Sequence, residues 1–177
     1  MCIRDRHNTS PADFLIITHP SLLPEAQRLA QFHLQYNGLR TATVTTEQVY
    51  NEFGSGSPDP AAIRDFVKIY YDKYALTPAN KPRYLLLFGD ASFDYKDRLS
   101  NNTNLVPAYQ SSFSNDPLST YTSDDFFGFL EDDEDINSGL VVNDLDVGIG
   151  RVPAKNAVCL LYTSEYAVAK TGSTPKR

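Results

Sequence analysis

Five consecutive apolar residues, Tyr84 to Phe88, run directly into Gly89 and Asp90. The run is too short for a typical globular helix, and it lacks the polar–apolar alternation of a strand with one wet face. It therefore predicts a strand that is buried on both faces, as in a parallel sheet covered by helices. Asp90 would then lie at the carboxyl end of that strand, where ligands bind in open α/β sheets. A simple turn-capping role for Asp90 is an equally good interpretation.

The rest of the chain predicts strands and helices in alternation. The expected strands are at 13–18, 39–45, 83–88 and 145–149, and the expected helices are at 24–37, 47–53 and 60–74. Two successive strand–helix–strand units form right-handed parallel crossovers in nearly all known cases. The predicted fold class is therefore α/β, with a doubly wound, mainly parallel sheet.

An acidic run superficially resembles a calcium loop. It contains Asp132, Asp133, Asp135, Asn137 and Gly139. The glycine stands one residue late for an EF-hand, and no glutamate closes the loop. A solvated hairpin tip is the stronger interpretation. We therefore expect no metal-binding residues and no cofactor, with calcium as the one candidate ligand.

The two ends of the chain are related at the DNA level. The codons ATG TGT ATA AGA GAC AG encode residues 1–6, and their reverse complement encodes Cys159-Leu-Leu-Tyr-Thr163 in one reading frame. This relationship resembles a transposase adapter from sequencing-library preparation, translated at both ends of a metagenomic fragment. We therefore expect residues 1–6 and 158–177 to be non-native, and 7–157 to be the genuine segment.

The genuine segment has no cysteine, because Cys2 and Cys159 lie in the excluded ends. It therefore carries no disulfide, zinc–thiolate site or cysteine nucleophile of its own. Acidic residues outnumber basic ones by 22 to 16 along the whole chain, which argues against nucleic acid as a partner. No apolar run is long enough to span a membrane.

The three histidines offer little catalytic signal. His7 adjoins the excluded end, and His33 lies in a predicted helix, where a packing or surface role is favoured. His19 follows a strand, which is a site-like position, but the sequence indicates no serine or cysteine partner for it. Glycine-rich phosphate-binding motifs are also missing, so a nucleotide site would rest on the fold alone.

Four segments carry a resemblance to a known family. Residues 84–90, 106–110, 123–128 and 146–153, in this order and spacing, resemble the gingipain family of cysteine peptidases. The resemblance covers nearly all of 13–157. It implies a caspase-like α/β fold in two subdomains, of which this chain holds the first. The catalytic histidine and cysteine would lie in the second, beyond Pro153, so this chain alone should be inactive.

The resemblance also implies one catalytic position. In gingipains, an acidic residue just before a Val-x-Ile-Gly-Arg run hydrogen-bonds the catalytic histidine. Asp146 stands there, where gingipains carry glutamate. A carboxylate suits this role because it fixes the imidazole tautomer and stabilises the imidazolium paired with the thiolate. A structural aspartate at the end of a strand is the equal alternative.

Within the family, the segments are most similar to the cell-surface sortase of type IX secretion. This resemblance implies a fragment of a cysteine endopeptidase that removes C-terminal sorting signals from exported proteins. It places the protein at the outer membrane surface of a Gram-negative bacterium. Its partners would be those substrates, other type IX secretion components and the missing second catalytic subdomain. The alternative is a non-catalytic α/β binding module, with calcium as a candidate ligand.

Overall fold

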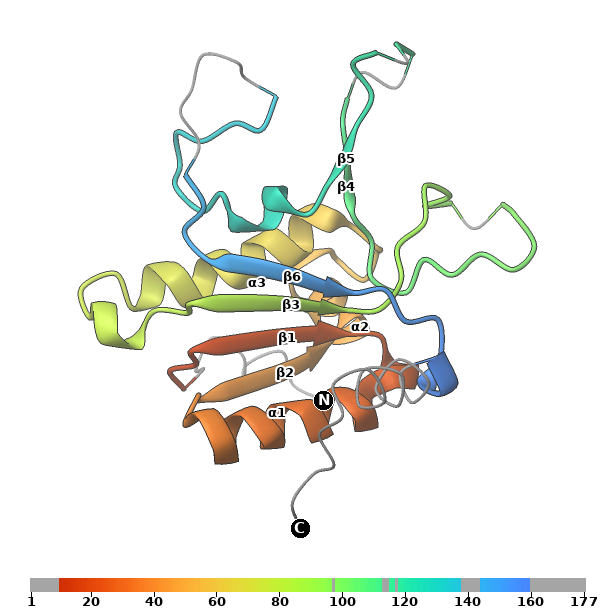
Figure 1. Ribbon diagram of the computed structural model, residues 1–177. Coiled ribbons are helices and arrows are strands. Elements are labelled where there is room, and N and C mark those ends of the chain that lie inside the picture. Colours follow the sequence, from red (N-terminus) through yellow and green to blue (C-terminus); the bar gives the residue numbers. More distant parts are fainter. Residues whose placement is uncertain (1–9, 97, 113–114, 117, 138–143, 160–177) are drawn as a thin grey trace.

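The centre of the molecule is a four-stranded parallel sheet with the order β2-β1-β3-β6 (Figure 1). The computed structural model describes residues 10–96, 98–112, 115–116, 118–137 and 144–159. The four strands are β1 (Phe14–Thr18), β2 (Thr41–Thr45), β3 (Tyr84–Phe88) and β6 (Gly148–Val152). The parallel α/β architecture predicted from the sequence is therefore confirmed.

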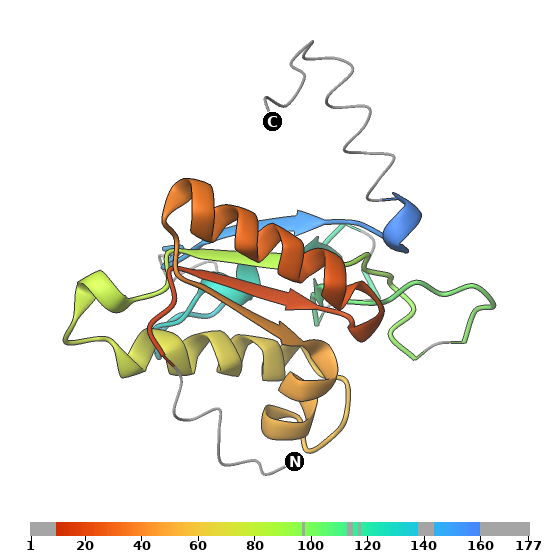
Figure 2. The same cartoon turned by 90° about the horizontal axis from the view of Figure 1, so that it is seen from below.

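Helices cover both faces of this sheet. Helix α1 (Leu23–Asn37) lies on one face, whereas α2 (Thr46–Phe53) and α3 (Pro60–Lys73) lie on the other, as Figure 2 shows. Short 3₁₀ turns are found at η2 (Pro20–Leu22), η3 (Pro78–Asn80) and η4 (Asp125–Gly128). None of the helices in the described ranges combines the length and apolar character needed to cross a membrane.

Local capping signals set the ends of these helices. Thr45 and Gln48 form a reciprocal capping box at the start of α2. Asp59 accepts the Ala61 N–H at the start of α3, and Gly38 ends α1 with a left-handed φ of 66°. Each of these residues satisfies backbone groups that a helix end would otherwise leave unpaired.

The core forms two layers, one on each face of the sheet. Strand β1 is buried along its whole length. On the α2–α3 side, Leu15 and Leu87 pack in a cluster that also contains Phe66 and Phe127. On the α1 side, Ile16 and Phe88 pack with the small residues of α1. The alternation of side chains along each strand supplies both layers at once.

A short antiparallel pair stands away from the main sheet. Strands β4 (Tyr109–Gln110) and β5 (Thr122–Ser123) form this arm on the β6 side of the molecule (Figure 1). The sequence does not predict this pair, because two-residue strands give no periodicity signal. The arm brings the chain from the end of β3 to η4.

The last strand lies later than predicted. The expected strand at 145–149 is wrong in position, because β6 begins at Gly148 and ends at Val152. The Asp146 amide donates to the Gly128 carbonyl at 3.0 Å rather than to the sheet. Residues 145–147 therefore precede the strand and approach the sheet alongside the 128–130 segment.

Candidate functional site

The four segments that carry the family resemblance meet in space. Segment 84–90 contains β3, and segment 146–153 contains its neighbour β6. Segments 106–110 and 123–128 are joined through the β4–β5 pair. They are also joined by the rings of Tyr109 and Phe126, which stack with centroids 4.3 Å apart. Residues up to about 60 positions apart therefore build one region next to β3 and β6.

Arg151 forms hydrogen bonds to several segments of this region. Its Nε and Nη2 atoms donate to the two carboxylate oxygens of Asp124 at 2.8 and 2.7 Å. Its Nη1 donates to the carbonyls of Gly89 and Val106 at 3.0 and 2.6 Å, and its Nη2 also donates to Pro107 O at 3.2 Å. The planar guanidinium suits this role because it presents several donors in a fixed fork. One side chain thus fixes the carboxyl end of β3 to the two following segments.

Asp90 lies at the carboxyl end of β3, as the sequence predicts. Its carbonyl accepts the N–H groups of Leu105 and Val106, both at 3.0 Å. Its Oδ2 atom accepts the Thr103 hydroxyl at 2.7 Å and lies 3.8 Å from Lys155 Nζ. The residue therefore closes the turn after β3 with its backbone, and its carboxylate is partly engaged. These contacts favour the turn-capping interpretation.

His19 lies at the same edge, directly after β1. Its Nδ1 atom lies 2.8 Å from Ser21 Oγ and accepts the Ser21 N–H at 3.2 Å, which makes His19 the cap of η2. Burial lowers the pKa of His19, and the nearby Glu47 carboxylate acts in the opposite direction. The ring borders a cavity of about 280 Å³ that Glu47 and Asn104 also line. The sequence interpretation missed Ser21 as a partner, although it is only two residues away.

His33 packs in α1, as its helical position predicts. Its ring lies edge-on against Phe14 and Phe32, with centroids 5.0 and 5.5 Å away. This is a packing role on the face of the sheet that α1 covers. His7 lies outside the described residues.

Asp146 lies at the amino end of β6, next to the segment that follows η4. Its Oδ2 atom accepts the Leu130 N–H at 3.1 Å. The pKa of Tyr71 on α3 is raised, first of all by the hydrogen bond between its hydroxyl and the Asp146 carboxylate. These partners hold the 128–130 segment against α3. These contacts are structural ones, so the catalytic role that the resemblance implies for Asp146 stays a prediction.

The described residues of the acidic run contact helix α3 and each other. Asp132 Oδ1 lies 3.0 Å from Lys68 Nζ, and Asp135 Oδ1 accepts the Asn137 N–H at 2.9 Å. Gly139 lies outside the described residues. Among the residues that are described, no group of three or more histidine, cysteine, aspartate or glutamate side chains could hold a metal ion.

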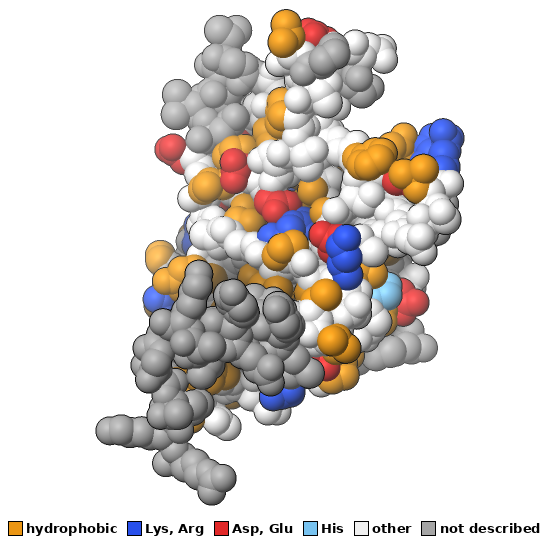
Figure 3. Space-filling model, turned by 45° about the vertical axis from the view of Figure 1, so that its right-hand side comes forward, with side chains coloured by type: hydrophobic (Ala, Val, Ile, Leu, Met, Phe, Trp, Pro, Cys, Tyr) orange, Lys and Arg blue, Asp and Glu red, His pale blue; other side chains and the backbone are white. Residues whose placement is uncertain are grey.

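Charged side chains of both signs lie next to each other on the side of the molecule that carries the carboxyl ends of the strands. In the space-filling view, basic side chains on this face do not gather into one patch (Figure 3).

Cys159 is the one cysteine in the described ranges, and it is exposed. The amide of Cys159 donates to Asn156 Oδ1 at 3.0 Å.

The doubly wound parallel sheet, together with the segments that meet at Arg151, defines an α/β domain of the caspase- and gingipain-like kind. The chain belongs to peptidase family C25, whose model matches residues 7–161. The chain is therefore a member of a family of cysteine peptidases.

Among solved structures, the chain is similar to that of dimeric latent PorU from Porphyromonas gingivalis. The two are 29% identical with a TM-score of 0.74, over 92% of this chain and 16% of that one. The chain thus spans a small part of the length of this relative. No curated protein sequence matches the chain significantly.

The sequence interpretation missed the role of Arg151. A signal was present, because an arginine within an otherwise apolar strand must find a carboxylate or several carbonyls. Its side chain is 13% exposed, against 26% for its partner Asp124. Which of the many acidic residues pairs with Arg151 depends on the path of the chain between β3 and β6. Sequence patterns do not give that path.

Proposed function

We propose that this chain is the first part of the catalytic domain of a cysteine endopeptidase that acts as a sortase. In this proposal, the intact protein removes C-terminal sorting signals from proteins exported by type IX secretion. It works at the outer membrane surface, with those proteins and other secretion components as its partners. The catalytic cysteine and histidine come from the part of the domain that follows residue 157.

One observation carries the proposal: the likeness to PorU extends over 92% of this chain at 29% identity. The family match on its own supports only a cysteine peptidase. The observed geometry fits a supporting role for this part of the domain. Arg151 and Asp124, which lie in the segments that carry the family resemblance, bind each other, and Arg151 also donates to backbone carbonyls.

The test is to recover the reading frame beyond codon 157 from the source DNA and to express the intact protein. It should cleave a fusion that carries a C-terminal sorting signal of the same organism, as measured by mass spectrometry. Substitution of the downstream catalytic cysteine by alanine should abolish cleavage. The 177-residue chain should leave the fusion uncut.

Two results would contradict the proposal. A complete reading frame without a histidine and a cysteine at strand ends would instead indicate a non-catalytic module. Cleavage by the 177-residue chain that disappears with Cys159→Ala would show that residue 159 is genuine and catalytic, and that the predicted adapter origin of this end is wrong.

Asp146 is the proposed residue that orients the catalytic histidine. In the intact enzyme, Asp146→Asn should lower kcat/KM by about 10- to 1000-fold, less than the loss seen for the aspartate of serine protease triads. Asp144→Asn is the control and should matter less. A structural role predicts a different result: because Asp146 accepts the Leu130 N–H, its substitution would lower Tm, and kcat/KM would stay near the wild-type value.

A further inference from the structure

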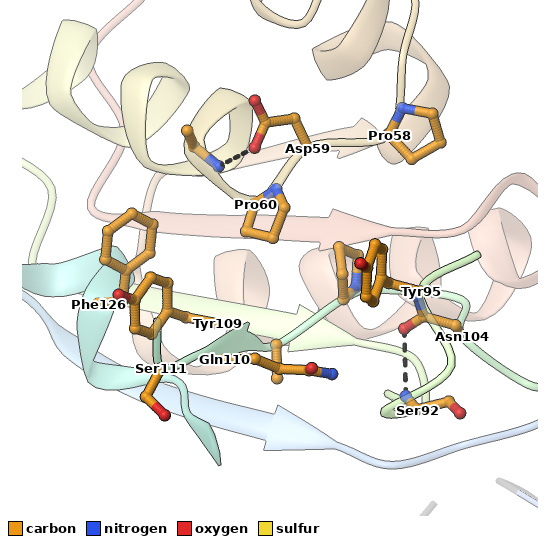
Figure 4. A pocket seen from close by; sticks show the side chains of 13 residues that line it. Pro58, Asp59, Pro60, Ser92, Tyr95, Asn104, Tyr109, Gln110, Ser111 and Phe126 are labelled. Atoms are coloured by element: carbon orange, nitrogen blue, oxygen red, sulfur yellow. Dashed lines mark hydrogen bonds between the residues drawn. The ribbon is translucent and has the colours of Figure 1, made fainter. Parts of the chain in front are cut away.

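A cavity of about 390 Å³ lies between the start of α3, the loop after β3 and strand β4 (Figure 4). We propose that it binds an extended peptide that carries proline next to a basic residue. The proposal is independent of the sortase function, because every lining residue that it uses is a described one and none of them is a catalytic group.

Aromatic rings stand on opposite sides of this cavity. Tyr95 lies on one side, and the stacked rings of Tyr109 and Phe126 lie on the other (Figure 4). Pro60, at the start of α3, and Pro107 add two prolyl rings to the lining. Grooves lined in this way bind polyproline II peptides, because flat rings pack against proline and the ligand is already extended before it binds.

The wall formed by Tyr109 and Phe126 is held in place by the fold. Tyr109 pairs with Ser123 in the β4–β5 ladder, and its hydroxyl lies 2.9 Å from Asn137 Nδ2. The ring of Phe126 packs against Phe127, which is fully buried. A binding surface that is fixed in advance loses little conformational entropy when a ligand binds.

Polar groups on the lining can meet the backbone of such a ligand. Gln110 lines the cavity, and its side-chain amide makes no hydrogen bond to another residue in the described ranges. Asn104 Oδ1 accepts the Ser92 N–H at 3.1 Å, and its Nδ2 is the end of that amide that can donate. Proline-rich peptides have carbonyl acceptors but few N–H donors, so amide donors on the lining are the complement they need.

On the α3 side of the rim the charge favours a basic neighbour, whereas on the opposite side Lys96 Nζ already lies 5.3 Å from the centroid of the Tyr95 ring. Asp59 is exposed, and it uses Oδ1 to accept the Ala61 N–H at 2.8 Å. The other oxygen of this carboxylate makes no contact with a basic side chain within the described residues. The chain as a whole carries a net charge of −6. An arginine beside the proline would therefore be attracted to this rim.

The mostly apolar lining distinguishes a peptide from a sugar as the occupant. A pyranose presents hydroxyl groups around its ring and needs many fixed polar partners. In this cavity, the aromatic, proline and alanine residues of the lining outnumber the serine, asparagine, glutamine and aspartate residues. A prolyl ring presents only methylene groups, which this lining can cover.

The test uses the 177-residue chain and a fluorescein-labelled peptide of one arginine followed by six prolines. Fluorescence anisotropy should show saturable binding. Tyr95→Ala should weaken it about tenfold, the typical effect of losing a central aromatic contact, and Gln110→Ala should weaken it as well. Tyr95 is 65% exposed, so its removal should leave the fold intact, which a thermal melt checks.

The control is Tyr36→Ala, since Tyr36 is 74% exposed on α1, away from the cavity, and should not change the affinity. A probe with glutamate in place of arginine should bind more weakly. Three results would overturn the proposal: no saturable binding, equal losses for Tyr95→Ala and Tyr36→Ala, or displacement of the probe by maltose at a lower concentration than by unlabelled peptide.

Discussion

Replacing Arg151 by alanine tests whether one guanidinium holds the segments around β3 and β6 together. Alanine removes the two hydrogen bonds to Asp124 and the three to the carbonyls of Gly89, Val106 and Pro107. The Asp124 carboxylate, which is only 26% exposed, would lose its cation. The free energy of unfolding should therefore fall well beyond what a surface substitution causes.

The magnitude follows from the burial of the pair. Leaving one member of a buried ion pair without its partner costs about 3–5 kcal/mol. Water reaches part of Asp124, so the lower half of that range, about 3–4 kcal/mol, is expected here. For a domain of this size, each kcal/mol shifts Tm by about 2–4 °C, which predicts a fall of roughly 6–16 °C.

Lysine at position 151 separates charge from geometry. Arg151→Lys keeps the positive charge but cannot form the fork to Asp124 while also reaching the backbone carbonyls. The loss of stability should be smaller than for Arg151→Ala, at about 1.5–3 kcal/mol, which is the value of one hydrogen bond to a charged group. In a double-mutant cycle with Asp124→Asn, the coupling energy should reach about 1–3 kcal/mol.

The assay is urea denaturation of the 177-residue chain followed by circular dichroism. Arg28→Ala is the matched control, because this arginine is exposed on α1 and its loss should change stability by less than about 0.5 kcal/mol. The reasoning is refuted if Arg151→Ala costs less than about 1 kcal/mol, or if the coupling with Asp124 is zero.

Three further changes test other parts of the structure. The Arg40 guanidinium lowers the pKa of Asp13, so this ion pair stabilises the fold above about pH 4 and loses its effect as the pH falls further. In urea melts at decreasing pH, the difference in stability between the wild type and Asp13→Asn should therefore shrink below about pH 4. Leu87→Ala should cost about 2–5 kcal/mol in the same melts, because Leu87 is fully buried, whereas Leu86→Ala should cost less, because Leu86 is only partly covered; equal losses would contradict the observed packing. Gly89→Ala should lower Tm by several degrees, because a Cβ atom would come within 2.8 Å of the Val106 side chain; an unchanged Tm would show that this turn adjusts freely.

Local signals were sufficient for most of the fold. The apolar run at 84–88 predicted a strand because strands of a covered parallel sheet need no polar face, and β3 does lie between β1 and β6. Burial on both faces is confirmed only in part, because Tyr84 is 46% exposed and Leu86 is partly covered. The helix predicted at 60–74 does begin at Pro60, because the cap that Asp59 provides depends only on residues that are neighbours in the chain. Gly38 ended α1 for the same kind of reason.

The features that the sequence did not predict depend on contacts between distant segments of the chain. The sequence suggested a strand at 145–149, but the Asp146 amide donates to the Gly128 carbonyl, and the ladder with β3 begins only at Gly148. Similarly, no periodicity reveals the two-residue strands β4 and β5, which depend on each other. The lining of the proposed peptide cavity also comes from segments between Pro58 and Phe126, so no single stretch of sequence indicates it.

The positions of Asp90 and Asp146 constrain where a second catalytic subdomain could dock. Asp90 follows the carboxyl end of β3, whereas Asp146 precedes the amino end of β6, which runs parallel to β3. Five residues of strand at roughly 3.3 Å each separate these two edges by about 16 Å. A histidine that contacts Asp146 therefore cannot also lie at the carboxyl edge near Asp90. If Asp146 orients the catalytic histidine, the second subdomain must approach along β6 towards its amino end, where the 128–130 segment and α3 already hold that carboxylate in place.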